Sequence, residues 1–322
     1  MLEYSKYFSG DLFMEKIITV AQVIAPIFAA IFLGVLARKK ALLTPEENRG
    51  LQQFVMKIAL PCVIFNSCLS AKIGAESVGT MLLLLPLVLG ATVWSFHARR
   101  KQFPYHNLPM LFAAQETSML GIPLFMILFG SDQAYRVAVL DVIQAAVAYP
   151  TIAILTANTG SNPTPRQIIK KVFSSPLVIM CLLGLTLNLT GIGAWLDGIG
   201  IGGIITESTS FLAQPVSAII IFTVGYNFSL ASGSRKTIFK VCIIHSLMFI
   251  AVGLIIQLGL FLIPSVDPLT RWAILLYSVL PSSFMAASLG KTEEEFTVAS
   301  GVTSLLTAVC LLAFCVIAAV VA

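Results

Sequence analysis

Long apolar segments recur along this chain, and they restrict its fold to helices that cross a lipid bilayer. A helix needs roughly 20 apolar residues to span the hydrocarbon core, because each residue rises about 1.5 Å. The chain has 322 residues, 57% hydrophobic and 11% charged, whereas soluble domains carry about 25% charged residues. We therefore predict an all-α polytopic membrane protein. Its ten predicted transmembrane segments are 17–37, 51–69, 77–97, 107–130, 134–156, 173–193, 206–228, 237–263, 269–290 and 295–321.

Basic residues in the connections predict the orientation. The connections after odd-numbered segments hold 14 Lys and Arg, whereas those after even-numbered segments hold only Lys72, Arg136 and Arg271. By the positive-inside rule, the odd connections are cytoplasmic and both termini lie outside the plasma membrane. The net charge of +5 thus reflects topology and does not indicate nucleic-acid binding. The first segment is too long for a signal peptide, so we expect no cleaved leader.

Two halves of five segments each would start on opposite sides of the membrane, so an internal repeat would be inverted. Matching prolines and glycines recur in order, at a spacing that grows slowly along the chain, as small insertions would produce. The matching positions are Pro26 and Gly34 with Pro176 and Gly184, Pro61 with Pro215, and Pro123 with Pro281. We predict two inverted five-helix repeats, 1–156 and 172–322, joined by a short cytoplasmic linker at 157–171.

The fourth segment, 107–130, is apolar but is interrupted by Gln115, Glu116, Thr117 and Ser118, and then by Pro123. Glu116 lies about ten residues from the nearest basic cluster, or about 15 Å into the membrane. A carboxylate at that depth costs a few kcal/mol or more. This pattern is typical of a discontinuous helix around a transporter binding site. The alternative is a proline-kinked helix whose glutamate is paired internally.

The ninth segment, 269–290, carries the matching interruption at Leu280 to Ser283. If both segments break near mid-membrane, they can cross there, with Pro123 and Pro281 in the first turns of the resumed helices. Such helix starts carry free N–H groups and a partial positive charge, so together they would attract a carboxylate. Alternatively, the serines bond to their own helix backbone. The candidate substrate-binding residues are Gln115, Glu116, Thr117, Ser118, Pro123, Gln144, Pro281, Ser282 and Ser283.

Two carboxylates are candidates for coupling transport to an ion gradient. Glu116 is either protonated, since desolvation disfavours its charged form, or it holds a proton or Na⁺ that moves with the substrate. Asp141 and Gln144 are three residues apart in the fifth segment and so share one helical face. Asp141 is the second coupling candidate. An interfacial cap or a pair with Arg136 is its alternative.

Several other features receive structural interpretations. Thr44, Pro45 and Glu47 have the spacing of a helix start. The six cysteines lie in apolar stretches without a C-x-x-C motif, so we interpret them as core residues and expect no metal site. Asn66 and Gln214 are expected to form interhelical hydrogen bonds, and His245 to lie at the membrane interface. The glycine-rich stretch 191–203 is predicted to be a turn.

The chain resembles the auxin efflux carrier family, which includes plant auxin exporters and bacterial malonate- or malate-type permeases. The similar stretches are IAPIFAAIFLGVLARK, LQQFVMKIALPCVIF, ETSMLGIPLF and YSVLPSSFMAASLG. The resemblance implies a scaffold of helices 1, 2, 6 and 7 and a transport domain of helices 3–5 and 8–10. It also implies an organic anion held where helices 4 and 9 cross, an elevator-like movement, and often a homodimer. Many relatives carry Asn just before the break in helix 4, so the Gln-Glu-Thr of this chain departs from auxin-like specificity.

We therefore predict a secondary transporter of an organic anion, such as a small dicarboxylate. No hydrolase or ATPase motif is found, so we expect neither an enzyme nor a cofactor, and coupling to H⁺ or Na⁺. A bile-acid-like Na⁺ symporter is the nearest alternative. A ligand sensor that binds without transporting is the alternative from another class.

Overall fold

A computed structural model of the chain describes residues 10–72, 75–99, 103, 105–157, 164–228, 235–263, 266–283 and 292–321. Within these ranges the structure is helical and contains no strand. The elements are α1 (Gly10–Lys39), α2 (Pro45–Phe54), η2 (Val55–Ala59), α3 (Leu60–Leu69), α4 (Ala75–Arg99), η3 (Leu108–Phe112), η4 (Thr117–Gly121), α5 (Ile122–Phe129), η5 (Ser131–Gln133), α6 (Tyr135–Ala157), α7 (Pro165–Phe173), α8 (Pro176–Leu189), α9 (Ile192–Gly198), α10 (Ile201–Ala213), α11 (Val216–Asn227), α12 (Arg235–Leu260), α13 (Pro268–Val279) and α15 (Glu293–Val321).

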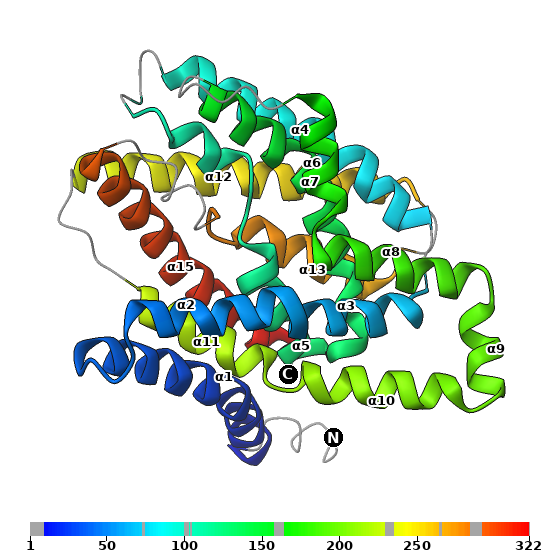
Figure 1. Ribbon diagram of the computed structural model, residues 1–322. Helices are drawn as coiled ribbons and strands as arrows, with labels where there is room; N and C mark the ends of the chain where they lie inside the picture. The colour runs from blue at the N-terminus through cyan, green and yellow to red at the C-terminus, as the bar shows by residue number, and fades with distance from the viewer. Residues whose placement is uncertain are drawn as a thin grey trace, which may run out of the picture.

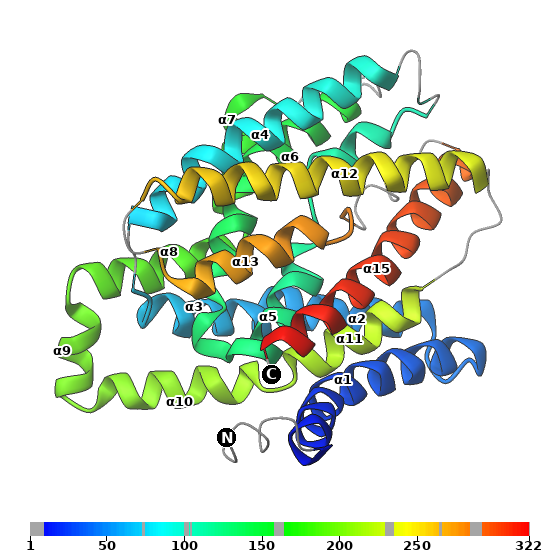
Figure 2. The ribbon, with the colours of Figure 1, turned by 180° about the vertical axis from the view of Figure 1, so that it is seen from behind.

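The helices pack in two groups. In the first group, α1 packs on α11, and α3 packs on both α8 and α10. In the second, α12 packs on α4, α13 and α15, and α4 packs on α6. Figure 1 shows α1, α10 and α11 along one side of the molecule and α4 and α12 along the opposite side, with α13 between them. The view from behind shows the same order (Figure 2).

Glycines bring the helices of the first group into close contact. A Cβ atom on Gly34 of α1 would overlap the carbonyl oxygen of Phe222 in α11. A Cβ on Gly184 of α8 would lie 2.7 Å from the carbonyl oxygen of Phe65 in α3. Membrane helices associate through such small residues, because lipid tails provide no hydrophobic force between helices.

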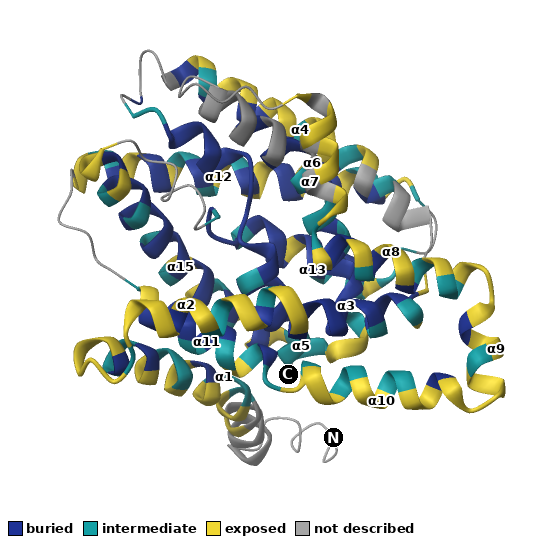
Figure 3. Ribbon diagram, in the orientation of Figure 1, coloured by how far each residue is buried: buried dark blue, intermediate teal, exposed yellow. Residues whose placement is uncertain are grey.

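The outer faces of the helices are apolar, as contact with lipid requires. Phe32, Phe211, Leu258 and Leu312 are between 65% and 72% exposed, and exposed positions line α1 and α10 in Figure 3. Among the described helices, five are long and apolar enough to cross a membrane, and the bent pair α8 and α9 would be a sixth. The chain is a polytopic membrane protein, as predicted. The five are Val20–Lys39, Pro45–Leu69, Ile201–Asn227, Arg235–Leu260 and Glu293–Val321.

The helix start at Thr44 is confirmed. Its side chain accepts a hydrogen bond from the Glu47 backbone N–H, and the Glu47 carboxylate accepts one from the Thr44 N–H at 2.7 Å. The sequence prediction began the first helix at residue 17, but α1 begins at Gly10. The linker predicted at 157–171 contains most of the helix α7, and the turn predicted at 191–203 contains the short helix α9. Turns at Gly191 (φ 74°) and Gly200 (φ 81°) bracket α9, because glycine adopts positive φ without strain.

Two further sequence interpretations have clear outcomes. All six cysteines are free, and five are buried, so their interpretation as core residues is confirmed and Cys315 is half-buried. His245, predicted at the membrane interface, is buried inside the protein at 1% exposure. Its ring packs between Phe112 at 5.6 Å and Phe249 at 4.7 Å, centroid to centroid.

Candidate functional site

The two predicted interruptions lie side by side. Helix η3 ends at Phe112 and the helix resumes at Thr117, while α13 ends at Val279. Between these ends the backbone N–H of Glu116 donates to the carbonyl of Pro281 at 2.8 Å, and that of Ser283 donates to the carbonyl of Ala114 at 2.9 Å. Gln115 and Ser282 thereby form an isolated antiparallel bridge. Unwound backbone is tolerated at membrane depth only where its polar groups find partners, and here each segment satisfies the other.

Pro123, predicted in the first turn of the resumed helix, lies in the first turn of α5, but the resumed helix as a whole starts earlier. It begins at Thr117 with a π-helical turn, in which the Glu116 carbonyl accepts from the N–H groups of Leu120 at 3.2 Å and Gly121 at 3.0 Å. Pro123 follows at the start of α5. Proline lacks an N–H and its ring crowds the preceding turn, and a π turn widens the helix there. Whether Pro281 opens a second resumed helix depends on residues 284–291, which lie outside the described residues.

Gln144 on α6 replaces hydrogen bonds that the break removes. Its amide oxygen accepts from the backbone N–H of Gln115 at 2.9 Å and from the hydroxyl of Tyr277 at 3.2 Å. Its amide nitrogen donates to the Gln115 carbonyl at 2.9 Å and to the Thr117 hydroxyl at 2.5 Å. The buried Gln144 amide therefore bonds both the N–H and the carbonyl of Gln115 in the unwound segment.

Asp141 lies one helical turn before Gln144 and meets the start of the resumed helix. Its carboxylate accepts hydrogen bonds from the hydroxyl of Thr117, from the hydroxyl of Ser118 at 2.6 Å, and from the Gln144 amide nitrogen at 3.1 Å. The shared helical face predicted for Asp141 and Gln144 is confirmed by this contact. The N-terminus of a helix is the location that favours a negative charge.

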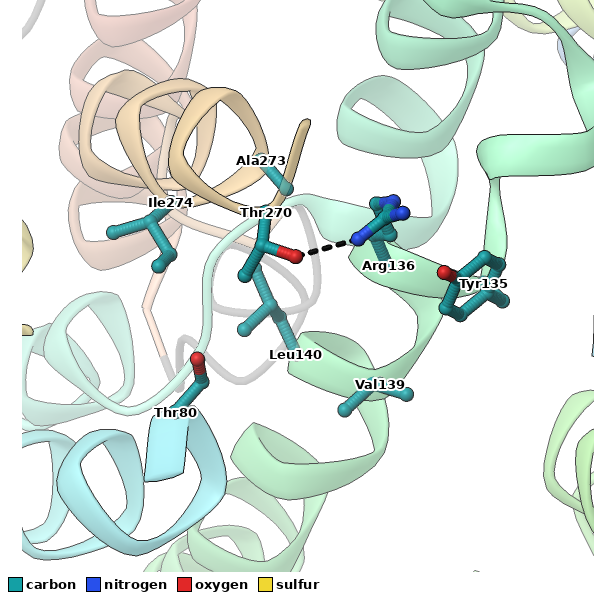
Figure 4. Close-up of a pocket in the computed structure, with 8 residues that line it drawn as sticks. All are labelled: Thr80, Tyr135, Arg136, Val139, Leu140, Thr270, Ala273 and Ile274. Atoms are coloured by element: carbon teal, nitrogen blue, oxygen red, sulfur yellow. Dashed lines mark hydrogen bonds between the residues drawn. The ribbon is translucent and has the colours of Figure 1, made fainter. Parts of the chain in front are cut away.

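The alternative pairing of Asp141 with Arg136 is wrong. Arg136 has its own partners, because its guanidinium donates to Asp267 at 2.7 Å, to Thr270 at 2.5 Å and to Gln133 at 3.0 Å. Figure 4 shows Arg136 reaching from α6 to Thr270 across a small pocket, which Thr80, Val139 and Leu140 also line. This cluster fastens the start of α6 to the start of α13.

Gln115 differs from its partner Gln144. Its side chain is 2% exposed, and its amide nitrogen and oxygen bond to no group among the residues that the structure describes. A buried amide without a partner costs about 1–3 kcal/mol. Glu116 beside it is also buried, at 6% exposure. The unpaired amide therefore has both a donor and an acceptor available for a ligand.

Two residues at the site were not found from the sequence. Tyr277 is 1% exposed and reaches Gln144 from α13. Thr303 of α15 shares a hydrogen bond with the Ser282 hydroxyl at 3.1 Å. Thr303 lies 21 residues after Ser282 in the sequence, and this distance hid the contact. The only indication in the sequence that Tyr277 belongs to the site is its position four residues before Pro281.

A cavity of about 810 Å³ opens between α5 on one side and α3, α10 and the start of α11 on the other. Asn66 of α3 and Gln214 next to α10 line it together with Met126 of α5. The interhelical role predicted for Asn66 is confirmed, because its amide donates to the Ser210 hydroxyl at 3.1 Å and accepts from Thr209 at 2.6 Å. The cavity reaches the far end of the helix that begins at Thr117.

Sequence comparisons identify the family. A family model described as a membrane transport protein matches residues 19–318. The chain belongs to this family. The match confirms the resemblance to auxin efflux carriers. The transporter is also 24% identical over 217 residues to a protein of Methanothermobacter thermautotrophicus (strain Delta H) that is named an uncharacterized transporter. That similarity covers 64% of this chain and 68% of the relative.

Proposed function

We propose that this transporter is a secondary carrier of a small organic anion, such as a carboxylate, at the plasma membrane. The observation that carries the proposal is the break at Gln115, where a buried amide beside the start of a helix bonds to none of the described residues. Substrate sites in secondary transporters are built from such discontinuous helices, whose N-termini face anionic groups.

The groups around the break suit a carboxylate ligand. The first N–H groups of the helix that starts at Thr117 have no partner within the helix. The Gln115 amide nitrogen would donate a further hydrogen bond. The hydroxyls of Thr117 and Ser118 would donate as well, but both now donate to Asp141. Asp141 therefore holds the position that a substrate carboxylate would take.

This competition links substrate binding to a proton. Two carboxylates at one helix start repel each other, and burial strengthens the repulsion. A proton on Asp141 removes its charge and allows Thr117 and Ser118 to turn toward the substrate. We propose H⁺ as the coupling ion on Asp141, with the buried carboxyl of Glu116 as the second candidate carrier. Na⁺ is the alternative coupling ion.

The packing of the helices supports two inverted repeats. Gly34 of α1 meets α11, and Gly184 of α8 meets α3. An inverted repeat makes α8 the counterpart of α1 and α3 the counterpart of α11, so these two contacts are equivalent. We propose that the first helix group is the scaffold and that the second group, together with α5, is the moving transport domain of an elevator, with the cavity between α5 and the scaffold. The homodimer and the external termini are further parts of this proposal.

Uptake into proteoliposomes tests the function. The purified protein is offered labelled mono- and dicarboxylates under an inward H⁺ gradient, an inward Na⁺ gradient, or neither. We expect saturable uptake that the H⁺ gradient drives, and loss of that saturation in Gln115→Leu. Gln53→Leu is the matched control, because Gln53 is exposed and belongs to α2.

Three other results would each change the functional assignment. Uptake that depends strictly on Na⁺ and prefers larger, steroid-like acids would assign the protein to bile-acid-like symport. Saturable binding without flux under any gradient would overturn transport and indicate a sensor. Unchanged saturation in Gln115→Leu would remove the break from the binding site.

A further inference from the structure

Helix α7 (Pro165–Phe173) joins the two halves of the chain and is specified by its own sequence. The backbone N–H of Thr164 donates to the Gln167 side chain at 2.7 Å, and the Gln167 N–H donates to the Thr164 hydroxyl at 3.3 Å. This reciprocal cap, followed by proline in the first turn, fixes the start of a helix without help from tertiary contacts. The helix then packs against the ends of α6 and α8.

The residues of α7 divide sharply between two faces. At about 100° per residue, the positions of its five apolar residues fall within an arc of about 140°, opposite its polar residues. Ile169 and Phe173 are each 58% exposed. Arg166 and Lys170 are exposed beside them, and Lys171 adds a third cation. The chain has no Asp or Glu between Asp141 and Asp197, so nothing nearby in sequence neutralises these charges.

We propose that α7 lies in the cytosolic interface of the bilayer and binds anionic lipid. Ile169 and Phe173 would enter the boundary of the acyl chains, while Arg166 and Lys170 meet lipid phosphates. Two features favour a lipid surface over a protein partner. The helix connects two membrane helices, so it cannot leave the surface, and its basic face complements an anionic leaflet. Basic amphipathic helices bind membranes in this way, and each cation near the surface adds about fivefold in affinity.

Lipid binding at α7 would affect transport through the position of this helix. The α6 helix before it belongs to the group that we propose to move, and the α8 helix after it belongs to the proposed scaffold. This second step rests on the proposed function, whereas lipid binding itself does not. Anionic lipid would hold the connection at the surface and thereby set the rate at which α6 changes position.

Tryptophan fluorescence in the full chain tests the lipid contact. Phe173→Trp is placed in vesicles of equal parts phosphatidylcholine and phosphatidylglycerol, with bromine on the acyl chains of one lipid or the other. The parent protein provides the background of its three native tryptophans. We expect stronger quenching of the added tryptophan by brominated phosphatidylglycerol. Arg166→Gln, Lys170→Gln and Lys171→Gln in combination should remove this preference, by about fivefold for each cation.

The matched control removes three cations elsewhere, with Lys39→Gln, Lys40→Gln and Arg49→Gln, and should keep the preference. Equal quenching by both lipids in Phe173→Trp with all three cations present would overturn the anionic-lipid assignment. Quenching by aqueous acrylamide without quenching by either lipid would show that α7 faces water or another protein, which also overturns it. Neither readout uses transport, so failure of the proposed function leaves this test intact. Uptake rates with and without phosphatidylglycerol then test the effect on transport.

Discussion

Where α1 meets α11, Gly34 lies so close to the Phe222 carbonyl that no larger side chain fits. At the break near Gln115, the helix is interrupted, and polar side chains from other helices take the place of its missing hydrogen bonds. The first region gains stability from dense contact between backbones. The second forgoes regular hydrogen bonding, and the buried amide of Gln115 has no partner in the part of the chain that the structure describes. A pair of helices packed this closely is suited to a fixed scaffold, whereas an interrupted helix with an unpaired amide is suited to binding.

Gln144→Leu should have the largest effect, because it removes every bond that this side chain makes to the break. The N–H and carbonyl of Gln115 and the hydroxyl of Tyr277 would each lose a buried partner. We expect a loss of about 3 kcal/mol in stability, measured by thermal unfolding in detergent. Gln115→Leu is the matched comparison and should be neutral or stabilising, because its amide has no partner to lose among the described residues. Equal destabilisation by both variants would contradict the contrast between the two glutamines.

Asp141→Asn separates binding from coupling. The substitution mimics the protonated carboxyl, so the variant should bind substrate but no longer accumulate it. For one proton per monoanion, a gradient of one pH unit drives about tenfold accumulation, since each unit is worth about 1.4 kcal/mol. We expect this accumulation in the parent and its absence in the variant, measured with labelled substrate in proteoliposomes. Glu46→Gln, at an exposed position in the first turn of α2, is the control. Retained proton-driven accumulation in Asp141→Asn would show that another residue carries the coupled proton, with Glu116 as the next candidate.

Gly34→Ala tests the dense contact between α1 and α11. Alanine favours a helix over glycine by about 0.5–1 kcal/mol, but here its methyl group would overlap the Phe222 carbonyl. Overpacking typically costs about 1–3 kcal/mol, so we expect net destabilisation in thermal unfolding. Gly90→Ala in α4 is the control, because nothing lies within 4 Å of its added Cβ. That variant should be slightly stabilised. Stabilisation by both substitutions would show that the helices separate without cost.

Tyr277→Phe should have the smallest effect. It removes one hydroxyl, which donates to Gln144 at 3.2 Å. A single hydrogen bond of this kind contributes about 1 kcal/mol, so we expect a decrease of a few-fold in substrate affinity and little change in unfolding temperature. Ligand-induced thermal shifts measure both quantities. A substrate affinity equal to that of the parent would show that the hydrogen bond from Tyr277 is not required to position Gln144 at the break.

The sequence alone determined which segments are apolar, where the fourth and ninth are interrupted, and that Asp141 and Gln144 share a helical face. These properties follow from local chemistry, because hydropathy, proline and helical periodicity act within a few residues. Only the tertiary structure decided that Asp141 contacts Thr117 and Ser118. It also decided that the side-chain amide of Gln144 is hydrogen-bonded whereas that of Gln115 has no partner among the described residues, and that Tyr277 and Thr303 belong to the site. These contacts connect residues up to 133 positions apart, and such partners are chosen by how helices pack. The start of the resumed helix was misplaced for the same reason, since pairing with Pro281 fixes where it begins.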